Sequence, residues 1–153
     1  MATRKSTAVT AGIMPDYTLP GLVLCRTARF TNKGVASGET IEMIPIPKGA
    51  KIVDMNVAIA ALTGSCSDIE VGDGGSNARF FNGISQEGAT SVAYNLAGEG
   101  VPGAIGYEYP ADDTIDIYIA KGVSEAGTAT NWIMNVFYKM AGSLADEDNL
   151  SNY

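Results

Sequence analysis

The stretch KIVDMNVAIAAL, residues 51–62, determines the fold class expected for this chain. Its larger apolar residues fall on every second position, at Val53, Met55, Val57 and Ile59. Small or polar residues stand between them, among them Asp54 and Asn56. Alternation with a period of two is typical of a β-strand with one buried face, whereas a helix would place Asp54 and Asn56 among the apolar side chains. We therefore predict a strand here.

Similar short segments recur on both sides of this strand and are separated by turn residues. The 18 glycines are scattered between the apolar runs, as the turns of an all-β fold require. Strands are expected at residues 22–30, 39–46, 51–62, 68–71, 79–81, 90–96, 107–109, 114–120 and 130–140. The only helical candidate follows Ser143, near the C-terminus. The sequence thus predicts an all-β domain, a β-sandwich of jelly-roll-like kind.

Three local predictions accompany this expectation. Pro45 and Pro47 each remove a backbone donor, so that end of the second strand should lie at a sheet edge or leave the sheet. Residues 72–77, GDGGSN, are expected to form a loop. In the last strand one face is expected in the core, and it consists of Trp132, Met134, Val136 and Tyr138.

The chain divides into a body and two terminal segments. Residues 22–141 form the predicted sandwich, and residues 142–153 form a short acidic tail. Residues 1–21 contain Pro15 and Pro20, each of which favours extended geometry in the preceding residue. Two interpretations of this segment remain open: an extended arm that reaches a partner, or a polar terminus without fixed structure.

The charge is negative overall and unevenly distributed. The net charge is −7, which disfavours binding to nucleic acid or to anionic membrane surfaces. Residues 1–51 nevertheless hold seven of the ten Lys and Arg residues and only three of the 17 Asp and Glu residues. Such a basic front on an acidic body can orient a protein against a polar partner, although a solvated mixture of charges is an equally good interpretation. No run approaches the roughly 18 apolar residues of a membrane span, and no secretory signal is expected.

Residues that could perform catalysis are few. The chain has no histidine, which excludes Ser-His-Asp and Cys-His catalysis and His-ligated metal sites. Cys25 and Cys66 are both expected to be small buried hydrophobic residues. The carboxylates that a glycosidase would need are explained instead as a solvent-facing strand surface, and they are Asp68, Glu70, Asp112, Asp113 and Asp116.

Oxygen ligands for calcium are present at Asp73, Ser76 and Asn77, but their spacing fits a turn better than a metal site. We therefore expect no catalytic residue, no metal and no cofactor. The aromatic candidates for a subunit interface are Tyr107, Tyr109 and Tyr118, because a phenol tolerates a half-hydrated setting.

Three segments carry a resemblance to a known class of proteins. They are ETIEMIPIPKGAKIVD (residues 39–54), IEVGDGG (residues 69–75) and RFFNG (residues 79–83). Together they resemble the head decoration, or capsid cement, proteins of tailed phages. The resemblance covers less than a third of the chain and rests on strand and turn residues.

The resemblance implies a structural protein of the virion that binds the outer surface of an assembled phage head and stabilises it, without enzymatic activity. It also implies the major capsid protein as partner, self-association into a homotrimer or homodimer, and residence in the host cytoplasm during assembly. Combined with the charge asymmetry, it makes Arg4, Lys5, Arg26 and Arg29 the expected capsid-binding residues. Two alternatives remain open: a phage tail or fibre component, and a carbohydrate-binding β-sandwich module that uses exposed tyrosines.

Overall fold

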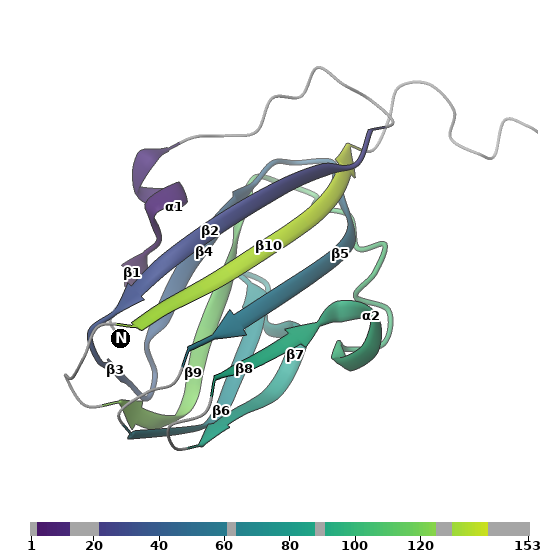
Figure 1. Ribbon diagram of the computed structural model, residues 1–153. Coiled ribbons are helices and arrows are strands. Elements are labelled where there is room, and N and C mark those ends of the chain that lie inside the picture. Colours follow the sequence, from purple (N-terminus) through teal and green to yellow (C-terminus); the bar gives the residue numbers. More distant parts are fainter. Residues whose placement is uncertain (1–2, 13–21, 61–63, 88–90, 125–129, 141–153) are drawn as a thin grey trace, which may run out of the picture.

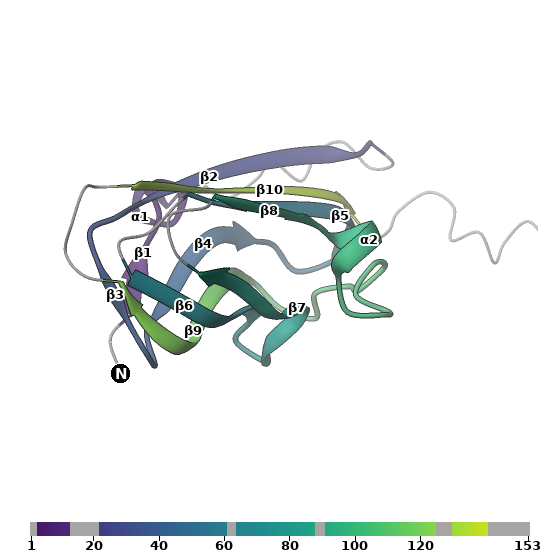
Figure 2. The same ribbon diagram turned by 60° about the horizontal axis from the view of Figure 1, so that its bottom comes forward.

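The computed structural model describes residues 3–12, 22–60, 64–87, 91–124 and 130–140. Its strands form two sheets that pack face to face (Figures 1 and 2). Sheet A has the order β1-β4-β9-β6-β7, with β3 also pairing with β9, and sheet B has the order β2-β10-β5-β8. The strands of sheet A are β1 (Thr3–Lys5), β3 (Val35–Ala36), β4 (Thr40–Ile46), β6 (Gly64–Asp73), β7 (Ser76–Glu87) and β9 (Asp113–Ser124). Those of sheet B are β2 (Leu24–Asn32), β5 (Ala50–Ile59), β8 (Val92–Asn95) and β10 (Thr130–Met140).

The long strands cross repeatedly between the two sheets. Apart from the β6–β7 hairpin, every connection between two successive long strands crosses from one sheet to the other. Strands from opposite ends of the chain therefore lie side by side, as β2 does with β10 and β4 with β9. Two packed sheets around one core form the layer architecture of a β-sandwich. The predicted all-β sandwich is confirmed.

The core lies between the sheets and is built by the alternation that the sequence shows. On β10 the predicted inward face is fully buried, with 0% exposure of Trp132, Met134, Val136 and Tyr138. On β9 the inward residues are Ile115, Ile117 and Ile119, also with 0% exposure. Each such side chain contributes roughly 1.5–3 kcal/mol on burial, so these two central strands anchor the two layers to each other.

Several local predictions need correction. The expected loop at residues 72–77 is shorter, because β6 runs to Asp73 and β7 begins at Ser76. The expected strand at residues 107–109 is only an isolated bridge between Glu108 and Lys51. A helical turn that we did not expect, α2 (Leu96–Glu99), follows β8. Its signal was available in the sequence, because the Asn95 side chain caps it by accepting from Gly98 N.

The proline prediction is confirmed. β1 pairs with β4 only from Thr40 to Glu42, so Pro45 lies where β4 forms the edge of sheet A on that side. On its other side the same residue is the register partner of Thr114 on β9. Proline is tolerated at such an edge because no neighbouring strand on that side requires the backbone N–H that proline lacks.

The N-terminal segment is folded onto the body at residues 3–12. β1 adds a parallel strand to β4, and α1 (Thr7–Ala11) follows it beside β2 (Figure 1). The interpretation of this segment as a terminus without fixed structure is therefore wrong for these residues. Residues 13–21 and 141–153 lie outside the described residues, so the predicted domain limits and the acidic tail with its possible helix after Ser143 stay predictions. The helices in the described part of the chain, α1 with five residues and α2 with four, are far too short to span a membrane.

Candidate functional site

The two N-terminal cations of the predicted capsid-binding set are used within the fold. The Arg4 guanidinium lies 2.9 Å from Glu39 Oε1 and also donates to the carbonyl oxygen of Gly34. The Lys5 ammonium lies 3.5 Å from Glu42 Oε2 on the neighbouring strand β4. Both contacts hold β1 against sheet A, so a structural role accounts for these two residues.

Ser6 fixes the change of direction from β1 to α1. It is buried, donates its hydroxyl to the carbonyl oxygen of Met43, and accepts from Val9 N at 3.3 Å. This is an N-cap, which satisfies one of the free amides at the start of a helix. Gly12, with φ of 62°, ends the helix in the left-handed conformation that glycine adopts readily. On the other side Thr7 Oγ1 donates to the carbonyl oxygen of Arg29 at 3.4 Å. Residues 3–12 therefore span the open side of the sandwich from β4 to β2.

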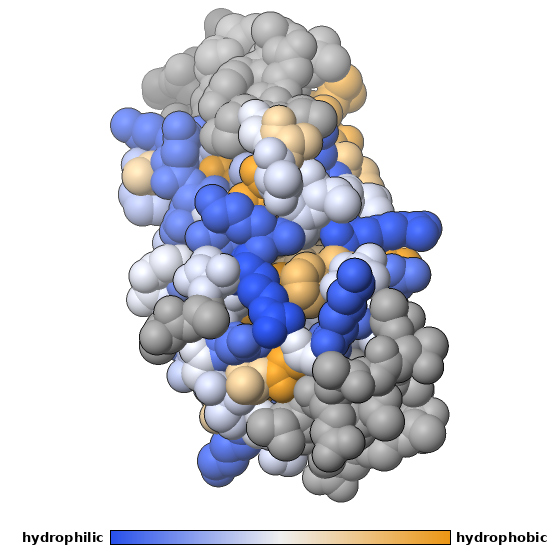
Figure 3. All heavy atoms as spheres, turned by 90° about the vertical axis from the view of Figure 1, so that its left-hand side faces the viewer, coloured by the Kyte–Doolittle hydropathy of each residue, from blue (hydrophilic) through white to orange (hydrophobic). Residues whose placement is uncertain are grey.

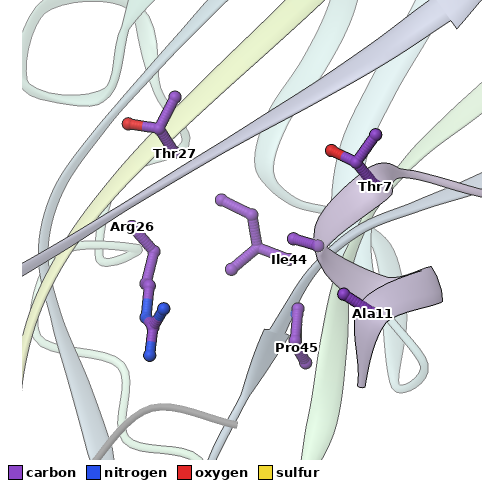
Figure 4. Close-up of a pocket in the computed structure, with 7 residues that line it drawn as sticks. Thr7, Ala11, Arg26, Thr27, Ile44 and Pro45 are labelled. Atoms are coloured by element: carbon purple, nitrogen blue, oxygen red, sulfur yellow. The ribbon is translucent and has the colours of Figure 1, made fainter. Parts of the chain in front are cut away.

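A groove remains beside this span. It has a volume of about 310 Å³ and is lined by Thr7, Ala8, Ala11, Arg26, Thr27, Ile44 and Pro45. Arg26 extends from β2 next to Ile44 and Pro45, opposite α1 (Figure 4). Seen from this side, the surface is dominated by hydrophilic side chains with small hydrophobic areas between them (Figure 3).

Arg26 and Arg29 differ in the side of β2 to which they belong. Ala28 and Phe30 are buried in the core, so Arg26 has the inward parity and enters the groove at the sheet edge. Arg29 is exposed on the outer face of sheet B, in register with Ile133. The structure thus separates two residues that were predicted together as capsid-binding residues.

The outer face of sheet B carries a ladder of short polar side chains. Thr27 Oγ1 and Asn135 Oδ1 are 2.6 Å apart, and Asn135 Nδ2 donates to Asn56 Oδ1 at 2.6 Å. Asn95 on β8 is the register partner of Asn56 and continues the row across the sheet. A third bond joins Thr31 Oγ1 to Asn131 Oδ1 at 3.2 Å. These bonds run between neighbouring strands, which keeps the side chains low along the surface.

The outer face of sheet A is acidic. Glu42 on β4 is the register partner of Asp116 on β9, and Glu70 on β6 is the partner of Tyr118 on β9. The predicted solvent-facing position of Asp68 and Glu70 agrees with the burial of Ile69 and Val71 between and beside them. Burial, and then the charges of Glu42, Asp113 and Asp73, raise the pKa of Asp116 to about 7, although the Thr114 hydroxyl acts in the opposite direction.

The hairpin between β6 and β7 has the turn chemistry that the sequence predicted. The Asp73 carboxylate accepts from Gly75 N and Ser76 N, each at 2.9 Å, and from Arg79 Nε. The hydrogen bond from Arg79 Nε to Asp73 raises the pKa of the Arg79 guanidinium further above its already high ordinary value. Arg79 in turn lies 3.9 Å from the ring centroid of Tyr107. Both oxygens of the Asp73 carboxylate therefore accept hydrogen bonds from within the protein.

The three tyrosines predicted at a subunit interface lie in different environments. Tyr109 is 1% exposed, and burial strongly raises the pKa of its phenol. It therefore offers no surface to a partner in this fold. Tyr107 is half-buried between Arg79 and Tyr109, and its ring lies 5.1 Å from that of Tyr109. Tyr118 is half-buried on the acidic outer face of sheet A. An interface role for Tyr107 and Tyr118 stays a prediction.

Other residues present apolar surface that the sequence analysis did not single out. Among the described residues the exposed large hydrophobic side chains are Leu22, Val23 and Ile105, with exposures of 54%, 56% and 50%. They lie at the same end of sheet B. Leu24, next to Leu22 and Val23, pairs with Tyr138 on β10, which in turn pairs with Ile52 on β5. The backbone of Ile52 is hydrogen-bonded to the loop that contains Ile105. Leu22 and Val23 precede β2, and Ile105 lies in the loop before β9, so the alternation within strands does not predict their exposure.

The cysteine prediction is half right. Cys66 is buried on β6, and burial raises the pKa of its thiol. Cys25 is exposed on the outer face of sheet B, in register with Phe137. The two residues look alike in the sequence, but Cys25 has the outward parity of an edge strand.

Comparison with known proteins relates this fold to phage capsids. A chain in the structure "Capsid of Ralstonia phage GP4" matches with a TM-score of 0.71 and 16% identity, over 93% of this chain and 100% of that chain. A chain in "Cyanophage Pam1 capsid asymmetric unit" matches with a TM-score of 0.57 and 17% identity, over 84% of this chain and 91% of that chain. At these identities the likeness shows a shared fold. No family model and no curated protein sequence matches this chain.

Proposed function

We propose that this protein is a structural component of a phage head, a decoration protein that binds the outer surface of the assembled shell and stabilises it. The observation that carries the proposal is the match to the GP4 capsid chain, which extends over 100% of that chain and 93% of this one. A complete chain of a phage capsid therefore has the same fold as this whole domain. The resemblance of residues 39–83 to capsid cement proteins, noticed in the sequence, supports the same class.

The proposed mechanism is adhesion without chemistry. The protein binds the major capsid protein as a rigid sandwich, bridges neighbouring shell subunits, and adds its contacts to theirs. Self-association into a dimer or trimer multiplies these contacts by avidity. The exposed apolar end of sheet B, formed by Leu22, Val23 and Ile105, is a suitable place for it. The protein then resides in the host cytoplasm during assembly and on the capsid surface afterwards.

The other classes considered from the sequence receive less support. A carbohydrate-binding platform needs open aromatic faces, but Tyr109 is buried, and Tyr107 and Tyr118 are half-buried. A tail or fibre component would share the all-β fold, but both matching structures are phage capsids.

The test is binding to purified phage heads that lack the protein. We expect wild-type protein to sediment with the heads to saturation and to raise the temperature at which they release their DNA. Antibody labelling in electron micrographs of whole virions should mark heads and leave tails unlabelled. Label confined to tails, or absence of sedimentation with heads, would contradict the proposal.

A further inference from the structure

We propose that the outer face of sheet B is the docking surface, and that its partner is a flat protein surface rich in carboxylates, contributed by the shell. The inference rests on the proposed function and adds which face of the sandwich binds and which chemistry it recognises. It follows from three properties of that face: flatness, uncompensated positive charge, and contrast with the opposite side of the molecule.

Flatness comes from the register of the four strands. One row across the sheet consists of Thr27, Asn135, Asn56 and Asn95, and the next of Arg29, Ile133, Ala58 and Ala93. The first three members of the polar row bond one another at 2.6 Å, so their side chains are already ordered. Little side-chain freedom is lost when such a surface is covered, which lowers the entropic cost of association. A shallow hollow of about 200 Å³ over β5 and β8 continues this surface beside Asn56 and Asn95.

The positive charges on this face have no internal partners. Arg29 lies at one edge, and Lys139 on β10 is the register partner of Lys51 on β5. Within the described part of the chain none of these three cations makes an ion pair, whereas Arg4, Lys5 and Arg79 are all paired. Two acidic residues adjoin these rows: Asp54, whose carboxylate accepts from Met55 N in its own strand, and Glu108, the bridge partner of Lys51, so the cations outnumber them by one. A partner that carries carboxylates could therefore pair with these cations without first breaking an ion pair within the protein.

The opposite side of the sandwich has the reverse character. The outer face of sheet A carries Glu42, Asp68, Glu70 and Asp116. Lys5 pairs with Glu42 and Lys121 is the register partner of Asp68, but the carboxylates remain in excess, which disfavours an acidic surface. The two faces therefore define a polarity, with sheet B toward the shell and sheet A toward solvent. Three strands about 30 Å long and the short strand β8, spaced about 4.8 Å apart, present on the order of 500 Å². This approaches the roughly 800 Å² that each partner contributes to a standard interface.

A second copy of the chain is the competing occupant, since its own sheet A is acidic. Stacking sheet B of one copy on sheet A of the next joins two different surfaces, and repetition of such a contact forms an open filament unless the rotation closes a ring. A finite complex on a shell is reached more simply when the acidic surface belongs to the shell itself.

The experiment compares two exposed lysines that lie on opposite faces. Lys139→Glu reverses a charge on sheet B, and Lys121→Glu makes the same change on β9 of sheet A. Arg29→Glu serves as a second variant on sheet B. Circular dichroism and thermal melting confirm that each variant folds, and sedimentation with purified heads in 50 mM and 300 mM salt gives the Kd of each.

We expect Lys139→Glu and Arg29→Glu each to raise the Kd at low salt by tenfold or more, and Lys121→Glu to change it less than twofold. Wild-type binding should weaken at high salt, as ionic contacts do. If wild type binds heads but Lys121→Glu alone weakens binding, or all three variants bind like wild type, the inference is overturned while the proposed function stands. If wild type fails to bind heads, the proposed function falls. Sheet B variants that abolish self-association in sedimentation velocity without heads, yet still bind heads, would assign this face to a second copy.

Discussion

Glu42 and Asp116 are register partners on the adjacent strands β4 and β9, so two carboxyl groups face each other on the outer surface of sheet A. Like charges in this position repel each other and destabilise a sheet. Two features relieve the repulsion. Lys5 from β1 lies 3.5 Å from Glu42, and Asp116 holds its proton up to a pKa of about 7, mainly because it is partly buried. The addition of β1 to sheet A therefore compensates a charge conflict within it.

Asp116 should make the stability of the protein depend on pH. Its pKa rises from 3.8 in the unfolded chain to about 7 in the fold, so below about pH 4 both states hold the proton. As the pH rises to about 7, only the unfolded chain releases the proton freely, and the free energy of unfolding falls. Asp116→Asn should be more stable than wild type at pH 8, by about 1–2 kcal/mol after solvent screening. Urea denaturation from pH 4 to pH 8 measures this, and parallel curves for both proteins would refute it.

Arg4 should matter for folding more than the exposed arginine of β2. Arg4→Ala removes the cation from Glu39, which is 9% exposed and otherwise accepts from Ala36 N at 3.1 Å. A poorly solvated carboxylate without its cation costs about 1–3 kcal/mol. Arg29→Ala, in contrast, should stay within about 0.5 kcal/mol of wild type, as exposed surface substitutions do. Chemical denaturation compares the two, and equal losses would contradict the role assigned to Arg4.

Gly72 should be irreplaceable although its backbone is not in the left-handed region. A Cβ atom at this position would lie 1.9 Å from the carbonyl oxygen of Ser76 and 2.4 Å from the carbonyl carbon of Asn77. Because these are backbone atoms, Gly72→Ala must distort the hairpin, at a cost of about 3 kcal/mol or more. Gly74→Ala is the matched control, since its Cβ would meet only the movable carboxylate of Asp113, at 3.1 Å. Thermal melting should show a large loss for the first variant and a small change for the second.

The two thiols should differ in reactivity in the native protein. Cys25 is exposed, whereas Cys66 is buried and has a raised pKa. Since the thiolate is the reacting species, an aromatic disulfide reagent at pH 8 should modify one thiol per chain within minutes and the second only after unfolding. Cys25→Ser should abolish the fast reaction. Two fast thiols in the wild type would place Cys66 at the surface.

The alternation of apolar and polar residues allowed the fold class and most strands to be predicted. The strand expected at residues 130–140 has the observed bounds of β10, and its inward face is the predicted one. Local pattern is sufficient here because a strand with one buried face must repeat every two residues. The helical turn α2 was missed, and the turn at residues 72–77 was predicted longer than it is, because both depend on a few capping and turn contacts rather than on a period.

The candidate site could be predicted only in part. Sequence identified the basic residues of the first 51 positions but gave Arg4, Lys5, Arg26 and Arg29 a single role. The fold pairs the first two internally, turns Arg26 into a groove, and places Arg29 beside a polar row whose members lie up to 108 positions apart.

The chain by itself therefore determined most of the side chains that enter the core, because burial of apolar surface acts residue by residue along a strand. The exception is β5, where a register irregularity between Ile52 and Asp54 buries Ile52 and leaves the predicted core residue Val53 half-buried. Only the tertiary structure decided which strands become neighbours, and with them which charges are neutralised within the protein and which remain on one face for a partner. The reason is that ion pairs and side-chain ladders form between strands brought together by long-range pairing, and local alternation carries no information about that pairing.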